Sequence, residues 1–344
     1  MIDKKDYGER VDTLRGLACI LLVFFHLVGN TPDTGLKLQA DSYYLIFNQV
    51  FENIRMPLFS FLGGIVFAIR PQKYKVSELI AGKFKRLIVP LFFVGVPFVY
   101  IKNHSGLAHV ERDAMTFSDY FDVLWLPVDH FWFLQSMFLV FIFFSMLNLL
   151  RYNYKNNIWK LFLFSVVLSI CLPNNILIFS FSGFLFLFPY FILGMICKYH
   201  SDKIENIREV NKVIGLIIVI VFILLFLTKL SFTIQGVELD RISVFCMSLS
   251  MVSLLSLLVT VKVVKPLVYI GKLSFSIYLY HIFFIGFSRK LLTTMGVGNV
   301  EINIVFGIAM TIILSWCVDS FCKKYKYLWV FIGTFPKNKN RVLS

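Results

Sequence analysis

Apolar runs of about twenty residues recur along the chain, separated by short polar or charged segments. A run of that length is typical of a helix that crosses a bilayer. The pattern predicts membrane-spanning helices at roughly 13–30, 54–69, 87–101, 131–150, 158–172, 177–197, 212–229, 242–261, 266–287 and 302–321. The runs at 87–101 and 158–172 are short. We therefore expect an all-α membrane protein, a bundle of about ten transmembrane helices.

The segments between the runs are too short to form a soluble domain, and no fixed-period repeat or low-complexity linker divides the chain. This predicts a single integral-membrane domain over 1–344, with a membrane-embedded core at about 10–325 and short tails. The longest predicted outer loop, 102–130, is acidic and aromatic, and the predicted inner segment 70–86 is strongly basic. No small-residue cleavage site follows the first apolar run, so we expect that run to be retained as a span.

The distribution of Lys and Arg predicts how the bundle is oriented in the membrane. The chain is 58% hydrophobic and 16% charged, with a formal net charge of +14. If the spans alternate, 26 of the 34 Lys and Arg residues lie on the side that holds both ends of the chain. Cytoplasmic loops carry such an excess, so both termini are predicted to be cytoplasmic. The same asymmetry explains the basic composition, and no nucleic-acid partner is expected.

Three polar residues interrupt the first span, "VDTLRGLACILLVFFHLVGN". Arg15 and His26 share one helical face about 16 Å apart along the axis, and Asp12, one turn before Arg15, can pair with it. Arg15 is then near the cytoplasmic surface, and His26 lies in the outer half. Arg15 could be a snorkelling anchor and His26 an interhelical hydrogen-bonding group. Ionisable residues within a span are, however, functional candidates by default.

The ninth span, "GKLSFSIYLYHIFFIGF", holds a second histidine in the predicted outer half, His281. Ser274 lies seven residues earlier on nearly the same face, and Tyr278, one turn earlier, could orient the imidazole. These residues could instead form a polar trio that only fixes helix contacts. Two histidines at similar depth favour a shared site.

Further candidates stand at the ends of other spans. Lys83 and Arg86, which open the third span from the inside, could bind a phosphate or serve as anchors. His130 and Trp132, which open the fourth from the outside, could line an acceptor groove or belong to the aromatic belt at the membrane interface. Arg55 at the predicted outer rim of the second span could contact a polar acceptor or act as an interfacial anchor.

Several sequence signatures are missing. The chain contains no nucleophile elbow, Walker loop, H-E-x-x-H pair or dinucleotide-binding fingerprint. The cysteines form no C-x-x-C pair, so no metal site and no disulfide framework are predicted. These absences argue against a hydrolase triad and against an ATP-driven pump.

Taken in order, the motifs resemble the acyltransferase-3 family of bacterial membrane acyltransferases. Arginine, ten residues and histidine in the first span match that family's signature, here Arg15 and His26. The stretches "MPLFSFLGG", "KFKRLIVP", "HFWFLQ" and "SFSIYLYH" agree with it further along the chain. Two positions depart from the pattern: Lys83 stands where the family's R-x-x-R motif has its first arginine, and Gly63 stands where a serine is usual.

The resemblance implies a multi-pass protein of the bacterial cytoplasmic (inner) membrane. It implies transfer of an acyl group, most often acetyl, from cytoplasmic acyl-coenzyme A to a sugar hydroxyl of an extracytoplasmic glycan such as O-antigen, capsule or exopolysaccharide. Acyl-coenzyme A would be a co-substrate, with no tightly bound cofactor. Arg15, Lys83 and Arg86 would hold the coenzyme A phosphates, and His26 and His281 would act on the thioester and the hydroxyl as bases or as an acyl carrier.

A different class of protein would use similar residues. A carrier, flippase or export component for a lipid-linked glycan also needs polar groups inside the membrane, but it needs no coenzyme A. The absence of internal repeats and broken-helix signals weighs mildly against a standard transporter.

Overall fold

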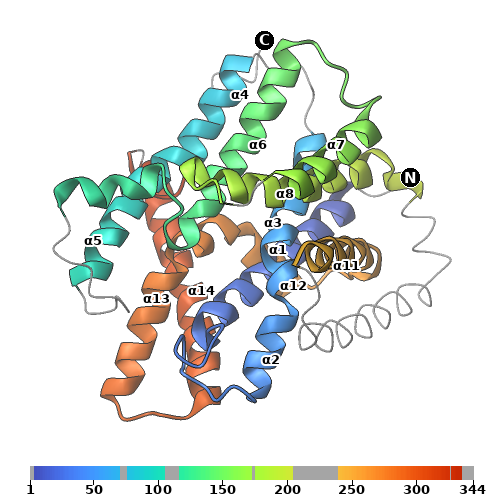
Figure 1. Cartoon of the computed structure of the whole chain (residues 1–344). Helices are drawn as coiled ribbons and strands as arrows, with labels where there is room; N and C mark the ends of the chain where they lie inside the picture. Colours follow the sequence, from blue (N-terminus) through green and yellow to red (C-terminus); the bar gives the residue numbers. More distant parts are fainter. Residues whose placement is uncertain are drawn as a thin grey trace.

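The computed structural model describes residues 4–69, 76–104, 116–172, 175–203, 239–325 and 327–334, and within these ranges the chain is helical and contains no strand (Figure 1). Among the described residues, six helical stretches are long and apolar enough to cross a membrane, or seven if one bent pair counts as a span. The all-α fold with several apolar helices long enough to cross a membrane is thus confirmed for the described residues. The predicted span 212–229 lies outside the described residues, and the number ten and the cytoplasmic termini stay predictions.

Most helices follow the predicted apolar runs. In chain order they are α1 (Lys4–Val28), α2 (Tyr43–Val50), α3 (Glu52–Ile69), α4 (Val76–Lys83), α5 (Val96–His104), α6 (Trp132–Leu149), α7 (Ile158–Cys171), α8 (Phe181–Tyr199), α11 (Leu239–Thr260), α12 (Lys265–Lys272), α13 (Ser274–Thr294) and α14 (Val300–Lys324). Shorter turns are η1 (Phe84–Ile88), η2 (Leu91–Gly95), η3 (Phe117–Leu124), η4 (Asp129–Phe131), η5 (Ile178–Ser180) and η6 (Leu328–Phe331). The helix α2 lies in a segment that the apolar pattern left between two spans.

The third span departs from a regular helix. The two π-helical turns η1 and η2 lie on either side of Pro90 and join α4 to α5. A π-turn carries one residue more than an α-turn, and such turns are frequent at functional sites. Arg86 lies within η1, so the distortion falls on a residue that the sequence singled out.

The expected ninth span, 266–287, is not one helix. α12 and α13 meet at a bend of 81° next to Leu273. α12 packs closely along α1, because a Cβ added at Gly271 would lie only 1.9 Å from the carbonyl oxygen of Asp12. The apolar pattern is continuous across the bend, so it does not reveal the break. The expectation of one continuous helix was therefore wrong, and His281 lies on α13, after the bend.

Glycines also join α3 to α8. A Cβ at Gly64 would lie 1.9 Å from the carbonyl oxygen of Phe191, and one at Gly194 would lie 2.0 Å from that of Phe61. Small residues allow such close backbone approach between helices in a membrane. Gly64 and Gly194 thus let the backbones of α3 and α8 pack in close contact.

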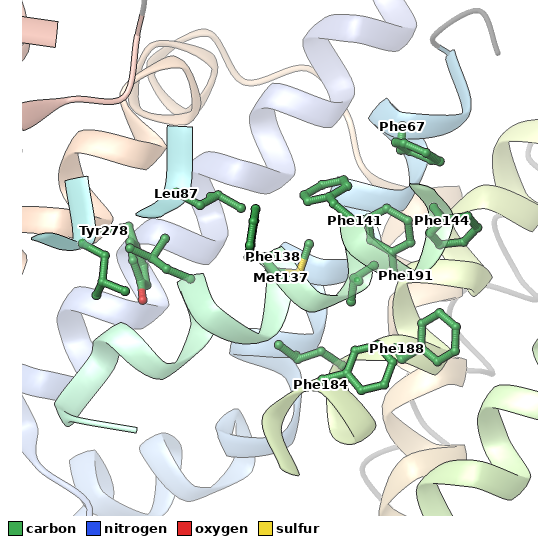
Figure 2. Close-up of a cluster of buried hydrophobic side chains, with 14 of the residues drawn as sticks. Phe67, Leu87, Met137, Phe138, Phe141, Phe144, Phe184, Phe188, Phe191 and Tyr278 are labelled. Carbon is green, nitrogen blue, oxygen red and sulfur yellow. The ribbon is translucent and has the colours of Figure 1, made fainter. Parts of the chain in front are cut away.

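Phenylalanine rings fill the space between α6, α8 and α3. Figure 2 shows Phe138, Phe141 and Phe144 on α6 beside Phe184, Phe188 and Phe191 on α8, with Tyr278 of α13 at the other end of the cluster. Ring centroids lie 5.1 Å apart for Phe67 and Phe144, within the range of favourable aromatic pairs. This packing holds α6 against its neighbours and thereby fixes the turn η4, which precedes it and contains His130.

Candidate active site

Three histidines from separate elements meet inside the bundle, and we call them the histidine cluster: His26 on α1, His130 in η4 and His281 on α13. The ring centroid of His281 lies 4.8 Å from that of His26 and 4.7 Å from that of His130. His281 is 0% and His130 4% exposed, whereas His26 keeps a partly accessible surface. The structure thus brings the two expected histidines together and adds the third from the acceptor-side candidates.

Backbone contacts select the tautomer of His281. Its Nδ1 lies 2.8 Å from the carbonyl oxygen of Tyr278 and 3.2 Å from that of Ile277. A carbonyl oxygen can only accept, so Nδ1 carries the proton and the Nε2 of the neutral ring carries a lone pair. Nε2 has no hydrogen-bond partner within the described ranges. One helix turn therefore presents a free basic nitrogen beside the rings of His26 and His130.

Tyr278 contacts two histidines, one through its backbone carbonyl oxygen and one through its hydroxyl. Its hydroxyl donates a hydrogen bond to the carbonyl oxygen of His130, not to the imidazole of His281. Tyr278 thus contacts the His281 imidazole through its backbone carbonyl oxygen, while its hydroxyl reaches across to the turn that precedes α6. It ties η4 to α13, which keeps the His130 ring beside His281.

Arg55 lies inside the protein, not at an exposed rim. Its side chain is 5% exposed, and its guanidinium carbon lies 3.5 Å from the ring centroid of Phe25, the residue before His26. It donates a hydrogen bond of 2.9 Å to Oδ1 of Asn48, and Nδ2 of Asn48 donates to the carbonyl oxygen of Gly29. The interfacial-anchor alternative for Arg55 was therefore wrong. A buried cation faces the end of α1 close to the histidine cluster.

Two other candidates lie outside the cluster. Ser274 is the first residue of α13, and its carbonyl oxygen lies 4.0 Å from Sγ of Cys19. Trp132 is partly buried, and its ring fills the space over Gly183, where an added Cβ would lie 2.6 Å from a ring carbon. The structure gives both residues packing contacts between helices.

The basic candidates sit apart from the histidines, and we call Arg15, Lys83 and Arg86 the basic rim. Arg15 pairs with Asp12 at 2.9 Å, as predicted, with 27% and 21% of the two side chains exposed. Arg86 is exposed, and its guanidinium carbon lies 5.7 Å from the ring centroid of Phe275. Nζ of Lys83 lies 3.4 Å from the ring centroid of Phe141. Arg86 thus lies beside the first turn of α13, Lys83 faces α6, and Arg15 lies one turn of α1 before Cys19, whose Sγ is near the carbonyl oxygen of Ser274.

Sequence reasoning missed Asn48. It lies in the short helix α2 and is 1% exposed, yet the chain around it, "YYLIFNQV", reads as part of a loop between spans. The only feature of the sequence that could have pointed to Asn48 was an amide beside apolar residues, whose spacing suits the buried face of a short helix. In the part of the chain that the structure describes, no group of three His, Cys, Asp or Glu side chains is arranged to hold a metal ion.

Comparison with known protein families finds one family model that matches most of the chain. A family model described as an acyltransferase domain, that of the acyltransferase-3 family, matches residues 9–319. The match includes Asp12, the three residues of the basic rim and the three residues of the histidine cluster. Neither the comparison with curated proteins nor that with solved structures finds a match.

Proposed function

The chain belongs to the acyltransferase-3 family, and from this premise we propose that it is a membrane O-acyltransferase. In the proposed reaction an acyl group, acetyl in the simplest case, passes from cytoplasmic acyl-coenzyme A to a sugar hydroxyl of a cell-surface glycan outside the membrane. The protein would lie in the inner membrane, with the basic rim toward the cytoplasm and the histidine cluster toward the outside.

One observation carries this proposal: three imidazoles from three elements meet, and two of them, His130 and His281, present ring nitrogens without a hydrogen-bond partner among the described residues. A buried polar atom without a partner is costly, so its retention inside a membrane protein is a sign of function. A structural contact between helices would need no free Nε2 on His281.

The proposed reaction assigns the proton to the cluster. The sugar oxygen attacks the thioester carbonyl carbon while His26, the accessible member, takes the hydroxyl proton. Once His26 is protonated, the lone pair on Nε2 of His281 would accept a hydrogen bond from its ring, which would orient that ring and stabilise its charged form. The carbon–sulfur bond then breaks, the ester forms, and the thiolate of coenzyme A takes the proton back. General base catalysis of this kind contributes about 100- to 10,000-fold in rate.

The basic rim supplies the donor side of the proposal. Arg86 lies beside the start of α13, and Arg15 lies one turn of α1 before Cys19, which contacts the same turn, so both could contact the phosphates of coenzyme A. Arginine suits such groups because its planar fork makes paired hydrogen bonds, whereas Lys83 adds a point charge. Eleven residues of α1 separate Arg15 from His26, which is about 16 Å of helix. The thioester at the end of a long flexible arm could bridge that length.

A single substitution tests the catalytic assignment. His26→Gln keeps a polar side chain of similar size but removes the imidazole, so we expect glycan acylation to be lost in cells while the protein still inserts into the membrane. Mass spectrometry of the extracted glycan measures the acylation, and immunoblotting of membrane fractions measures insertion. Unchanged acylation in this variant would refute the role of His26.

Binding of acetyl-coenzyme A separates an enzyme from a glycan carrier. We expect purified wild-type protein in nanodiscs to bind labelled acetyl-coenzyme A and Arg15→Ala to bind it much more weakly. A glycan carrier has no need of that compound, so absence of binding to the wild type would favour the carrier.

A further inference from the structure

A second polar group lies at the end of α1 that carries His26, and it comprises Asn30, Glu52 and Arg55. Nδ2 of Asn30 lies 3.5 Å from Oε1 of Glu52, and Arg55 follows Glu52 by one turn of α3, close enough for the two charges to interact. We propose that these three side chains form the subsite for the acceptor sugar. This inference rests on the proposed function, which requires a glycan acceptor beside the histidine cluster.

The place of this group fits an acceptor. Arg55 packs on the ring of Phe25, whose centroid lies 4.7 Å from that of His26. Asn48, the partner of Arg55, also lies within 3.5 Å of the carbonyl oxygen of Phe25. Glu52 is exposed, and Asn30 and His26 are partly exposed, so the group runs from the surface inward to the accessible histidine. A hydroxyl held by this group would be next to the proposed base.

The chemistry of the group matches hydroxyl groups. Each hydroxyl both donates and accepts a hydrogen bond; a carboxylate only accepts, a guanidinium only donates, and an amide does both. Oδ1 of Asn30 is buried and has no hydrogen-bond partner among the described residues, so it offers an unused acceptor. The charges of Glu52 and Arg55 offset one another. A neutral, hydroxyl-rich ligand suits this pairing better than a phosphate or another anion.

The subsite is held in place before any ligand arrives. The chain turns back directly after α1 at Gly29, with φ of +89°, and again at Gly35, with φ of +58°. Oγ1 of Thr34 accepts hydrogen bonds from the backbone N–H groups of Asn30 and Thr31, at 3.0 and 3.1 Å. Oδ1 of Asn48 likewise fixes the Arg55 side chain by accepting a hydrogen bond from its guanidinium. Side chains that are fixed in advance lose little entropy on binding, which favours recognition of a weakly held sugar.

The test measures the two substrates separately. Wild-type protein and variants in nanodiscs receive labelled acetyl-coenzyme A and glycan that was extracted from cells carrying the gene and stripped of its esters with mild base. For Glu52→Gln, Asn30→Ala and Arg55→Lys we expect the glycan concentration at half-maximal transfer to rise about tenfold, which corresponds to about 1.4 kcal/mol each. The half-saturating concentration of acetyl-coenzyme A should stay unchanged, since the donor binds at the other end of α1.

The chain offers a matched control. Glu301, like Glu52, is an exposed glutamate in the first turn of a helix, and its carboxylate accepts a hydrogen bond from Tyr44 at 2.8 Å. Glu301→Gln should leave the glycan dependence at its wild-type value. If the three variants match the wild type, or if Glu301→Gln is equally impaired, the subsite is wrong. If the wild type itself transfers no acyl group to the glycan, the proposed function fails as well.

Discussion

The histidine cluster and the basic rim lie at opposite ends of the Arg15–His26 face of α1, and they are built in different ways. The cluster draws His26, His130 and His281 from three elements, and two of the three side chains are almost fully buried. In the rim, Arg86 is exposed and Arg15 is about a quarter exposed, with one ion pair to Asp12. Burial fixes geometry and makes a lost partner costly, whereas exposure leaves charge as the main contribution. Substitutions should therefore act differently at the two ends.

The sharpest test of this difference removes a buried imidazole. His281→Ala deletes the only described side-chain nitrogen next to His26 whose lone pair is fixed by backbone contacts, and we expect the maximal rate of acyl transfer to fall by up to the factor of about 100 to 10,000 that a positioned general base contributes. Binding of acetyl-coenzyme A at the rim should persist. Transfer of labelled acetyl groups at saturating substrate gives the rate, and equilibrium binding gives the donor affinity.

His200 offers the matched control for that variant. Its Nδ1 lies 3.0 Å from the carbonyl oxygen of Ile196, so it shares the local geometry of His281, but it stands at the end of α8 and outside the histidine cluster. His200→Ala should transfer acyl groups at the wild-type rate. Equal losses in the two variants would mean that the effect reflects general destabilisation and that His281 has no special role.

Close backbone packing also distinguishes the two ends, because α12 presses on α1 beside the rim. Gly271→Ala places a Cβ 1.9 Å from the carbonyl oxygen of Asp12, which must push the two helices apart. We expect a loss of stability of about 1–3 kcal/mol, together with weaker donor binding because Arg15 shifts. Thermal unfolding followed by intrinsic fluorescence measures the first effect. Gly82→Ala is the control, since nothing lies within 4 Å of its added Cβ, and it should unfold at or above the wild-type temperature.

The sequence predicted the histidines and the Arg15–His26 spacing better than it predicted the contacts between helices. His26 and His281 stand out because ionisable residues are rare in apolar runs, and helical periodicity gave the spacing of Arg15 and His26 without any structure. The bend beside Leu273 and the role of Asn48 could not be read in this way. Both depend on which helices touch, and periodicity within one helix carries no information about its neighbours.

Arg55 also shows that the sequence of one helix does not reveal its tertiary contacts. An arginine near the start of a span, two residues before Pro57, has the sequence signature of an interfacial anchor. In the structure the side chain is buried because α2 folds back and Asn48 satisfies one of its donors. Only the tertiary contact distinguishes the two cases.

The donor side should respond to charge more than to shape. Arg15→Ala removes one cation from the proposed phosphate site, and we expect the half-saturating concentration of acetyl-coenzyme A to rise about tenfold, or about 1.4 kcal/mol, with a nearly unchanged maximal rate. Arg15→Lys should recover part of the loss because charge remains without the planar fork. Lys265→Ala, which removes an exposed lysine that pairs with Glu9 at 2.7 Å, should leave donor affinity unchanged. A fall in maximal rate alone for Arg15→Ala would place Arg15 in the chemical step.

The smallest expected effect belongs to the partner of Arg15. Asp12→Asn breaks an ion pair whose two side chains are both partly exposed, and pairs of that kind contribute at most about 1 kcal/mol to stability. The unfolding temperature should therefore stay close to that of the wild type. Donor affinity should rise slightly, since Asp12 no longer competes with a phosphate for the guanidinium. If acetyl-coenzyme A binds more weakly to Asp12→Asn, Asp12 is needed to hold Arg15 in its binding position, and the rim depends on fixed geometry as the histidine cluster does.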